Sequence, residues 1–434
     1  MKFAFKNLLL EPYRLFFGFG ALYSVSFMAV WFEWLLSLSH HAPFAEWQLE
    51  SAAVHSHTLI YGVIGFYVFG FSLTAFPRFV GHALPGPRTL LPLWSALLLS
   101  QIFLLLGAFK APFWIIPAAF FEAGSYLVLT ALLTRFYLRQ PGRGGNRQPV
   151  FILIALFSGG MGSLFFHLFS IFRLPIVFYR LSLEIGTYPF LLLLVVSITY
   201  RIVPFFTGRI VPGYTPLRGK YTLEIVTGLL LLRLTASFFP LGLKIQNFSM
   251  WILNLALLFV LGREWKGWLP SRLRQAPILM VLYLGLGWIL IFLGFSGFEL
   301  VYHLAKPEAA AFSLFSTPSL HALYVGAFGT LLLGISTRVV RGHGGLPMVA
   351  DPWMLLSLLC IQAAALIRVF FPVLGLYWKA FGAQTHWAGF FWCLAFGLWS
   401  YRYLPILGWP KTGEEEPPIK IQDFSSKKAS IGSS

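Results

Sequence analysis

Twelve long apolar stretches run along the chain, and short segments that carry most of the charged residues separate them. A helix that crosses a bilayer needs about 20 consecutive, mostly apolar residues, and these stretches approach or exceed that length. The pattern therefore predicts twelve membrane-spanning helices, at Leu15–Leu38, Val54–Phe76, Leu90–Phe109, Phe113–Leu133, Val150–Phe172, Phe178–Val203, Tyr221–Phe239, Ile245–Leu261, Pro277–Phe295, Ser319–Val340, Pro352–Phe371 and Thr385–Leu404.

Composition indicates the same class of protein. Of the 434 residues 58% are apolar and only 11% are charged, too few charges to cover the surface of a soluble protein of this size. We therefore expect an all-α polytopic membrane protein whose partner is the lipid bilayer, with residues 1–409 forming a single transmembrane domain. Residues 410–434 are polar and contain proline and serine, so we expect them to form a disordered cytoplasmic tail.

The formal net charge of +17 does not point to nucleic acid, because the basic residues are distributed among the loops. One set of alternate loops, together with the two termini, carries 24 Lys and Arg residues, whereas the opposite set carries 7. Loops rich in Lys and Arg face the cytoplasm in membrane proteins. The asymmetry therefore predicts that both termini are cytoplasmic, which requires an even number of spans.

A few ionisable or reactive residues fall inside the apolar stretches. Glu184 and Arg233 lie at similar depth in antiparallel neighbours, so we expect them to form an ion pair, which lowers the cost of burying both. Structural pairing is favoured over a proton pathway, to which Glu122 would be a further contributor. Cys360 and Cys393 are expected to be core thiols and not a disulfide or metal pair.

The histidines are concentrated at one depth. Eight of the ten lie in or near the outer third of the predicted membrane region: His40, His41, His55, His57, His167, His303, His321 and His386. A lone histidine is usually an interfacial or hydrogen-bonded residue, but several at one depth in different helices indicate metal binding, since imidazole suits iron, copper and zinc. His55, His57, His167 and His321 are the candidate metal ligands.

Two of these histidines, His55 and His57, are only two residues apart on one helix. A separation of two residues corresponds to a rotation of about 200° around a regular helix. The two imidazoles should therefore face opposite sides of the helix and serve two different centres, or one centre and a supporting hydrogen bond.

The second and tenth predicted helices resemble each other. Each begins with a histidine that is followed by glycine at +5, +8 and +13 and by serine at +15. The sixth helix repeats part of this pattern near its inner end, which suggests three four-helix repeats. The glycines make one face of each helix smooth, for close helix packing or for a flat ligand. With a histidine above that face we expect haem binding, with His57, His321, Gly62, Gly65, Gly326 and Gly329 as the candidate cofactor-binding residues.

These motifs resemble the NnrS family of bacterial inner-membrane proteins. The matching segments are "HSHTLIYGVIGFYVFGFSLTAFPRFVG", "FFHLFS", "YRIVPFFTG", "LHALYVGAFGTLLLGISTRVVRGHGGLP" and "WAGFFWCLAFGLWSYRYLPIL". The resemblance implies a haem- and copper-containing protein of the inner membrane that takes part in the response to nitric oxide. Thr58 stands where the pattern has an acidic residue, and Tyr283 where many members carry histidine. Because this histidine is missing, the resemblance leaves open whether copper is bound in addition to haem.

The resemblance also aligns His343 with a family histidine. It lies 22 residues, roughly 30 Å of helix, from His321, so both cannot reach one iron. We therefore expect that His343 is not a ligand of the main centre.

Two functions remain open from the sequence. The first is a haem- or copper-binding membrane protein in the response to nitric oxide or nitrosative stress. The second is a secondary transporter of a small solute or metal complex, a class in which twelve helices and repeats are common. No pattern argues for catalytic turnover, and the paired histidine of a binuclear copper site is missing, which argues against oxygen reduction.

Overall fold

The computed structural model describes residues 4–40, 46–140, 147–238, 242–270, 277–305, 316–375 and 377–410. Within these ranges every regular element is a helix, which confirms the all-α fold. The predicted tail lies almost entirely outside the described residues. So do the whole of His41 and the side chains of His40 and His303.

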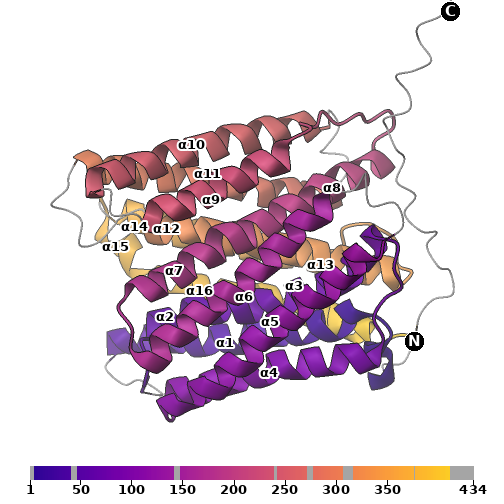
Figure 1. The fold of residues 1–434 in the computed structure, drawn as a ribbon, viewed down its shortest axis with the longest axis horizontal. Helices are drawn as coiled ribbons and strands as arrows, with labels where there is room; N and C mark the ends of the chain where they lie inside the picture. The colour runs from indigo at the N-terminus through magenta and orange to yellow at the C-terminus, as the bar shows by residue number, and fades with distance from the viewer. Residues whose placement is uncertain are drawn as a thin grey trace, which may run out of the picture.

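Each of the twelve predicted spans corresponds to a helix or to a continuous run of helical segments (Figure 1). Nine consist of one main helix: α1 (Pro12–His40), α4 (Pro87–Phe109), α5 (Ile115–Leu138), α6 (Gln148–Phe172), α9 (Thr222–Phe238), α10 (Leu243–Trp268), α11 (Pro277–Ala305), α14 (Pro352–Leu374) and α16 (Trp387–Leu407). Three are composite: α2 (Ser51–His57), η2 (Thr58–Val63) and α3 (Ile64–Phe79); α7 (Val177–Ile185), η4 (Gly186–Leu192) and α8 (Leu193–Ile210); α12 (Ser316–His321), η7 (Ala322–Gly329) and α13 (Thr330–His343). Short helices are η1 (Phe5–Leu9), η3 (Pro112–Trp114) and α15 (Lys379–Ala383).

Ten of the described helical runs are long and apolar enough to cross a membrane, so the chain is a multi-pass membrane protein. The two predicted spans that are not among these ten form the helices α9 and α16. Helix α9 has only 17 residues. Helix α16 contains three tryptophans and two tyrosines, aromatic residues that occur often at membrane interfaces and lower its mean hydropathy.

The two ends of the described chain meet at one end of the bundle. The backbone N–H of Ala4 donates to the carbonyl of Gly408 over 3.0 Å, and the Asn7 amide donates to the same carbonyl over 2.8 Å. We call this the terminal end; it lies on the right in Figure 1, and the charge asymmetry predicts that it faces the cytoplasm. The opposite end, where α2, α7 and α12 begin, is called the histidine end.

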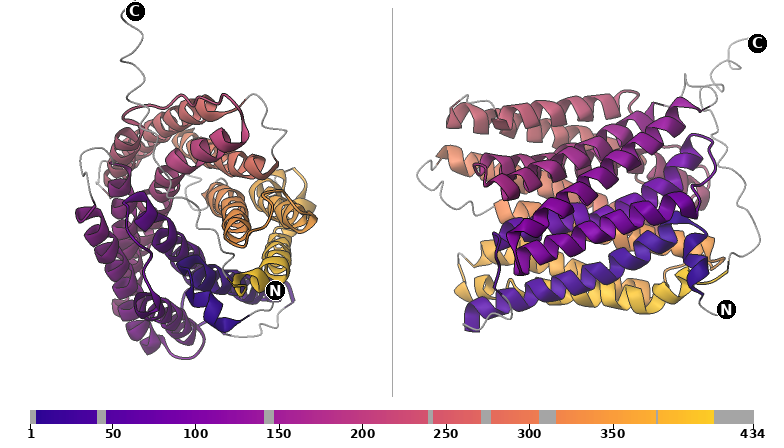
Figure 2. Two further views of the ribbon diagram at one scale, coloured as in Figure 1. Left: turned by 90° about the vertical axis from the view of Figure 1, so that its right-hand side faces the viewer. Right: turned by 60° about the horizontal axis from the view of Figure 1, so that its bottom comes forward.

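The three composite helices form the interior of the bundle. Their most apolar windows are 89%, 78% and 78% buried, whereas no other candidate span exceeds 61%. Seen along the helices, the first, middle and last thirds of the chain occupy successive sectors of the bundle (Figure 2, left). This arrangement agrees with the three predicted repeats, because the composite helices are the second, sixth and tenth.

Each interior helix contains a π-helical segment, and two of the three directly follow a candidate histidine: η2 follows His57 and η7 follows His321. The wider π turn changes the direction of nearby side chains and leaves backbone carbonyls without their usual partners. One such carbonyl, that of Tyr61, accepts a hydrogen bond from the Tyr126 hydroxyl at 3.0 Å. The segments are also connected, since the hydroxyls of Thr187 in η4 and Tyr324 in η7 lie 2.7 Å apart.

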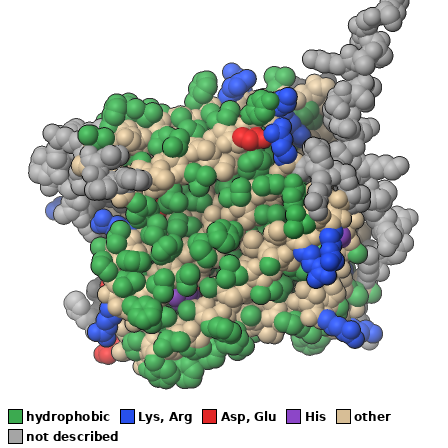
Figure 3. Space-filling view, in the orientation of Figure 1, with side chains coloured by type: hydrophobic (Ala, Val, Ile, Leu, Met, Phe, Trp, Pro, Cys, Tyr) green, Lys and Arg blue, Asp and Glu red, His purple; other side chains and the backbone are tan. Residues whose placement is uncertain are grey.

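The outer surface of the bundle is apolar, as contact with lipid requires. Hydrophobic side chains cover most of the face in Figure 3, and lysines and arginines lie towards its two ends. Phe120, Phe259 and Leu359 are 76%, 71% and 66% exposed although they lie within membrane-length helices. Exposed apolar side chains on this scale are stable in a bilayer and not in water.

The predicted intramembrane ion pair is confirmed. Arg233 bonds Glu184 through its terminal nitrogen and Asn254 through Nε at 3.0 Å. Its guanidinium also lies 3.5 Å from the centre of the Tyr188 ring. The two cysteines, Cys360 and Cys393, are free thiols, as expected.

Candidate functional site

The main polar cluster is formed by side chains of four helices from the first half of the chain, α2, α4, α5 and α6, and these side chains converge on the carboxylate of Glu122. Its Oε2 atom lies 2.7 Å from Nε2 of His57 and 2.8 Å from Nε2 of His167. The Ser163 hydroxyl donates to the same oxygen over 2.5 Å, and the Gln101 amide donates to Oε1 over 2.7 Å. All five side chains are at most 2% exposed, so this is a water-excluded polar cluster within an apolar bundle.

The four contacts are compatible with an ionised carboxylate. An ionised Glu122 can accept from all four neighbours, which uses its full acceptor capacity. His57 and His167 then both direct an N–H at Glu122 through Nε2. Their Nδ1 atoms are buried without any hydrogen-bond partner. Unpartnered nitrogens at this depth are costly, which makes the cluster a functional candidate.

Local structure places each member. His57 is the last residue of α2, directly before the π turn η2, and Glu122 lies in the first third of α5. His167 and Ser163 lie four residues apart on α6, hence on one face of that helix. The Phe166 ring stacks on the His57 imidazole with centroids 3.8 Å apart, which holds the imidazole towards Glu122 and excludes water.

The donor set fits a transition-metal ion. His57, Glu122 and His167 offer two imidazole nitrogens and one carboxylate oxygen that lie within 4.8 Å of one another, and all three residues are buried. Two imidazoles and a carboxylate suit copper, iron or zinc. With bonds of about 2.0–2.1 Å, ligand atoms in a tetrahedral site lie about 3.3 Å apart. A bound ion would therefore widen the 2.7 and 2.8 Å contacts by about half an ångström.

A second histidine cluster lies between α1, α2, α12 and α14. His321 Nδ1 donates to the carbonyl of Thr317 over 2.7 Å, and its Nε2 accepts from Nε of Arg368 at 3.1 Å. His55 interacts electrostatically with both Arg368 and His321, and its ring stacks on Trp31 with centroids 4.0 Å apart. The guanidinium occupies the nitrogen that His321 would offer to a metal, so this cluster is less suited to an ion than the first.

The structure therefore separates the predicted ligands. His55 and His57 face opposite sides of their helix, as the rotation of the helix predicted. His57 lies with His167, whereas His321 lies with His55 and Arg368. Haem binding by His57 and His321 stays a prediction, and their separation gives no support to ligation of one iron by both.

The four candidate glycines do not leave room for a flat ligand. A Cβ atom on Gly62 would lie 2.2 Å from Oε1 of Gln101, and one on Gly65 would lie 2.8 Å from the Tyr126 hydroxyl. On the repeated helix, Gly326 is covered by Trp288 and Gly329 by Ile361, with closest approaches of 2.5 and 2.8 Å. These faces pack against protein side chains, so haem does not fit over them in this structure.

Sequence reasoning missed three members of the two clusters, Gln101, Ser163 and Arg368, and gave Glu122 only a minor role. Glu122 carried a usable signal, because an isolated carboxylate in an apolar span is functional by default. Arg368 carried the same signal near the outer end of the eleventh predicted helix. Gln101 and Ser163 carried none, since neutral polar residues are common in membrane helices.

The sequence comparison assigns the chain to a family. The family model described as "NnrS protein" matches residues 7–411. The chain belongs to the NnrS family. No curated protein matches it.

Two positions where this NnrS chain departs from the expected pattern can now be located. Thr58 is fully buried at the start of η2, next to His57. Tyr283 lies in the terminal half of the bundle, where its hydroxyl donates to the carbonyl of Trp268 over 2.7 Å and lies 3.1 Å from the Thr207 hydroxyl. In place of a histidine, this NnrS protein has a structural hydrogen bond between α8, α10 and α11.

Proposed function

We propose that this NnrS-family membrane protein binds a transition-metal ion between His57, Glu122 and His167 and takes part in the response to nitric oxide. The observation that supports the metal site is the convergence of two imidazoles and one carboxylate in a buried, membrane-embedded position. The role in nitric oxide stress rests on the family resemblance, as does the choice of copper among the metals that the donor set fits.

The residues of the chain prepare this site in advance. Gln101 and Ser163 each donate to Glu122, which fixes the carboxylate plane and keeps the residue ionised. Phe166 and Tyr61 lie against the His57 ring and limit access by water. A bound copper or iron ion would supply an open coordination position and a change of redox state, the properties that binding of a small diatomic molecule requires.

Haem remains part of the proposal only through the family resemblance. The glycine faces that the sequence offered for it are filled by Gln101, Tyr126, Trp288 and Ile361. A haem in this protein would need another position or a rearrangement of these side chains. We therefore assign no residue to haem.

The test is metal content of the full-length protein purified in detergent after growth with added copper, with an absorption spectrum of the same sample. We expect about one ion per chain in the wild type and a loss of at least tenfold in metal affinity for His57→Ala and for His167→Ala. His82→Ala is the matched control, since that ring stacks on Phe136 near the terminal end and should retain the ion.

Three results would decide against the site. If the purified wild-type protein contained no metal, the secondary transporter would become the better supported function. Equal metal content in the wild type and both histidine variants would move the ion elsewhere in the chain. A haem band that disappears in His57→Ala or His321→Ala would show that the glycine faces open to admit haem.

The physiological part needs its own measurement. Cells that lack the protein should grow more slowly under a nitric oxide donor, and wild-type protein should restore growth. His57→Ala should not restore it, whereas His82→Ala should. Equal growth in all strains would remove the nitric oxide role without affecting the metal site.

A further inference from the structure

A large cavity lies at the terminal end, away from both histidine clusters. Its volume is about 790 Å³, and α1, α3, α8 and α13 form its walls together with the segment that leads into α14. The view onto this end is given in Figure 2, left. A space of this size is comparable to the sites in which proteins bind cofactors and lipids.

The wall of the cavity is both basic and aromatic. Its polar members are mostly basic: Arg78, Arg201, Arg209, Arg338 and His343. None of the residues that the structure places in the wall is acidic. The apolar members include five phenylalanines: Phe17, Phe71, Phe79, Phe205 and Phe206.

Part of this positive charge is already neutralised. Glu11, which is 2% exposed and lies outside the wall, accepts from Arg78 at 3.1 Å and lies 2.8 Å from Nδ1 of His343. Its pKa is lowered: burial alone would raise it, but the hydrogen bond and charge of His343 and the charges of Arg78 and Arg14 outweigh burial. Arg78 and His343 therefore already share an anionic partner, and the other three arginines of the wall are Arg201, Arg209 and Arg338.

Those three guanidinium groups are held in a similar way. Arg201 lies over Phe79 at 4.4 Å, Arg209 over Phe205 at 4.8 Å and Arg338 over Phe206 at 3.6 Å, each measured to the ring centre. Stacking uses the flat face of a guanidinium, whereas binding of a phosphate or carboxylate uses its N–H edge. The aromatic contacts therefore orient the groups and remain compatible with an anion inside the cavity.

Membrane topology explains why these arginines lie at the cytoplasmic side of the membrane, but not why some of them lie inside the helix bundle. The positive-inside rule concerns loops, whereas Arg201 and Arg338 lie within helices and are half-buried and buried. Several wall residues are exposed apolar side chains, among them Ile210, Val349 and Leu355 at 38%, 57% and 42%. The cavity thus opens beside the apolar surface of a bundle that lies in lipid.

We propose that this cavity is a binding site for an anionic phospholipid. The phosphate group lies among Arg201, Arg209 and Arg338, and the acyl chains lie along the phenylalanine wall and leave past Ile210 and Leu355. Basic pockets between membrane helices on the cytoplasmic side are suited to anionic headgroups, and a lipid satisfies both the charge and the apolar lining.

The experiment compares two lipids with identical acyl chains added to delipidated full-length protein: phosphatidylglycerol, which is anionic, and phosphatidylcholine, which is zwitterionic. Thermal unfolding and native mass spectrometry report stabilisation and the number of lipids retained. For the wild type we expect a higher melting temperature and a retained molecule with phosphatidylglycerol only. For Arg201→Gln/Arg209→Gln we expect about twenty-fivefold weaker phosphatidylglycerol affinity, from about fivefold for each arginine.

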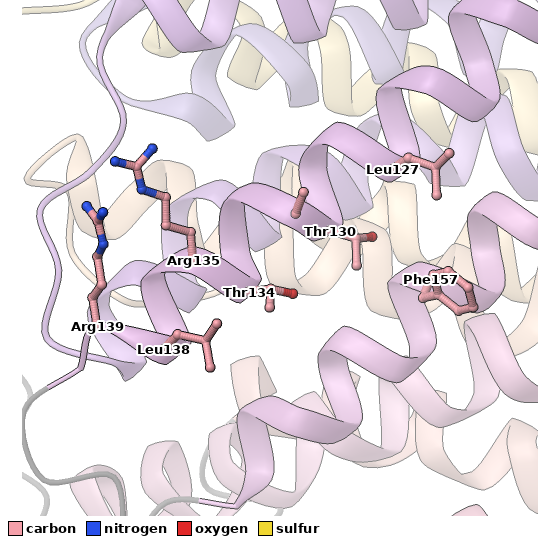
Figure 4. Close-up of a pocket in the computed structure, with 8 residues that line it drawn as sticks. Leu127, Thr130, Thr134, Arg135, Leu138, Arg139 and Phe157 are labelled. Atoms are coloured by element: carbon pink, nitrogen blue, oxygen red, sulfur yellow. The ribbon is translucent and has the colours of Figure 1, made fainter.

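A matched control is available at the same end of the bundle. Arg135 and Arg139 are exposed and border a shallower surface groove between α5 and α6, and Figure 4 shows their side chains away from Leu127 and Phe157. Arg135→Gln/Arg139→Gln removes the same charge and should leave lipid retention within about twofold of wild type. Arg209→Gln alone tests an exposed residue whose loss should not disturb folding and should weaken binding about fivefold.

The outcomes separate clearly. Equal stabilisation of the wild type by the two lipids, or no retained phosphatidylglycerol, overturns the proposal. If Arg201→Gln/Arg209→Gln and the control Arg135→Gln/Arg139→Gln lost equal affinity for phosphatidylglycerol, the binding would be a general attraction between a basic surface and anionic lipid, and the proposal would be overturned. Loss in the cavity pair and in Arg209→Gln, with the control pair unaffected, supports it.

Discussion

Substitution of Glu122 tests how much the hydrogen-bond network of the buried cluster contributes to the stability of the protein. Replacing it by alanine removes the acceptor of four hydrogen bonds at once. Replacing it by glutamine keeps the shape of the side chain and one oxygen. Glutamine changes the hydrogen-bonding capacity at almost constant volume, whereas alanine also leaves a cavity, so the glutamine variant compared with wild type isolates the network and the alanine variant gives the loss of the whole side chain.

The expected magnitudes follow from the contacts. In Glu122→Ala the donors on His57, His167, Ser163 and Gln101 lose their acceptor in a site that water does not reach. At about 1 kcal/mol for each buried donor, the lower part of the usual range, the loss is about 4 kcal/mol.

In Glu122→Gln the loss is smaller. The new amide oxygen can replace Oε2 for the two histidines and the serine, and the new NH₂ group then faces Gln101. Gln101 can turn its amide so that its oxygen accepts from that group, since the Tyr23 hydroxyl, 3.1 Å from Gln101 Oε1, can act as donor or acceptor. The stability cost should therefore be about 1 kcal/mol.

The assay is unfolding of purified protein in detergent, followed by tryptophan fluorescence without added metal. We expect Glu122→Ala to be less stable than Glu122→Gln by at least about 3 kcal/mol, since alanine loses the hydrogen bonds and also leaves a cavity. Both variants should bind metal more than tenfold more weakly than wild type, because each lacks the anionic ligand. If alanine and glutamine variants unfolded together, or if Glu122→Ala matched the wild type, the network of hydrogen bonds would not be the reason for burying this carboxylate.

Further predictions concern other parts of the molecule. A double-mutant cycle on Glu184→Gln and Arg233→Gln should give a coupling energy of about 1–3 kcal/mol, and additive effects would contradict the ion pair. Asp351 has a pKa below its ordinary value of 3.8, because burial, which would raise it, is outweighed by the N–H of Met354 and the nearby arginines. Its ionised form therefore stabilises the fold at neutral pH and loses this effect as pH falls below 3.8. Asp351→Asn should thus be less stable than wild type by about 1 kcal/mol at neutral pH, and the difference should shrink as pH falls below 3.8 and through the lower pKa of the folded state. His343→Ala should leave metal content unchanged, and a changed metal spectrum would make His343 a ligand. A reporter fused to the C-terminus should be active in the cytoplasm, and activity only outside would reverse the topology.

The helices could be predicted from the sequence because the membrane requires long apolar runs and the structure keeps them. The π-helical segments could not. A run such as Ala322–Gly329 has the composition of any apolar helix, and nothing in it indicates where one extra residue enters a turn. The second and tenth helices were nevertheless singled out, because a histidine and small residues recur in them at equal spacing, and the sixth was added because it repeats part of this pattern near its inner end.

For the candidate site, the sequence pointed to histidines at this depth, but neither to the carboxylate as a ligand nor to the grouping of the residues. His57, Glu122 and His167 come from three helices, and the rotation of each helix about its own axis decides which side chains meet. That rotation depends on packing, which one sequence does not reveal. The same limit applies to Gly62: a smooth helix face can receive a flat ligand or a side chain, and here Gln101 occupies it.

The three π turns help to explain why the equivalent positions before them differ in their suitability for cation binding. Each turn interrupts the regular hydrogen bonding of an interior helix and turns the preceding side chain towards its neighbours. His57 precedes η2 and meets a carboxylate, whereas His321 precedes η7 and meets the guanidinium of Arg368. Ile185 precedes η4, and its apolar side chain has no atom that could form a hydrogen bond with a charged neighbour. The repeated backbone therefore provides three equivalent positions, and the charge of the neighbouring helix decides which of them can hold a cation. Only the position at His57, beside Glu122, combines an imidazole with a negative charge.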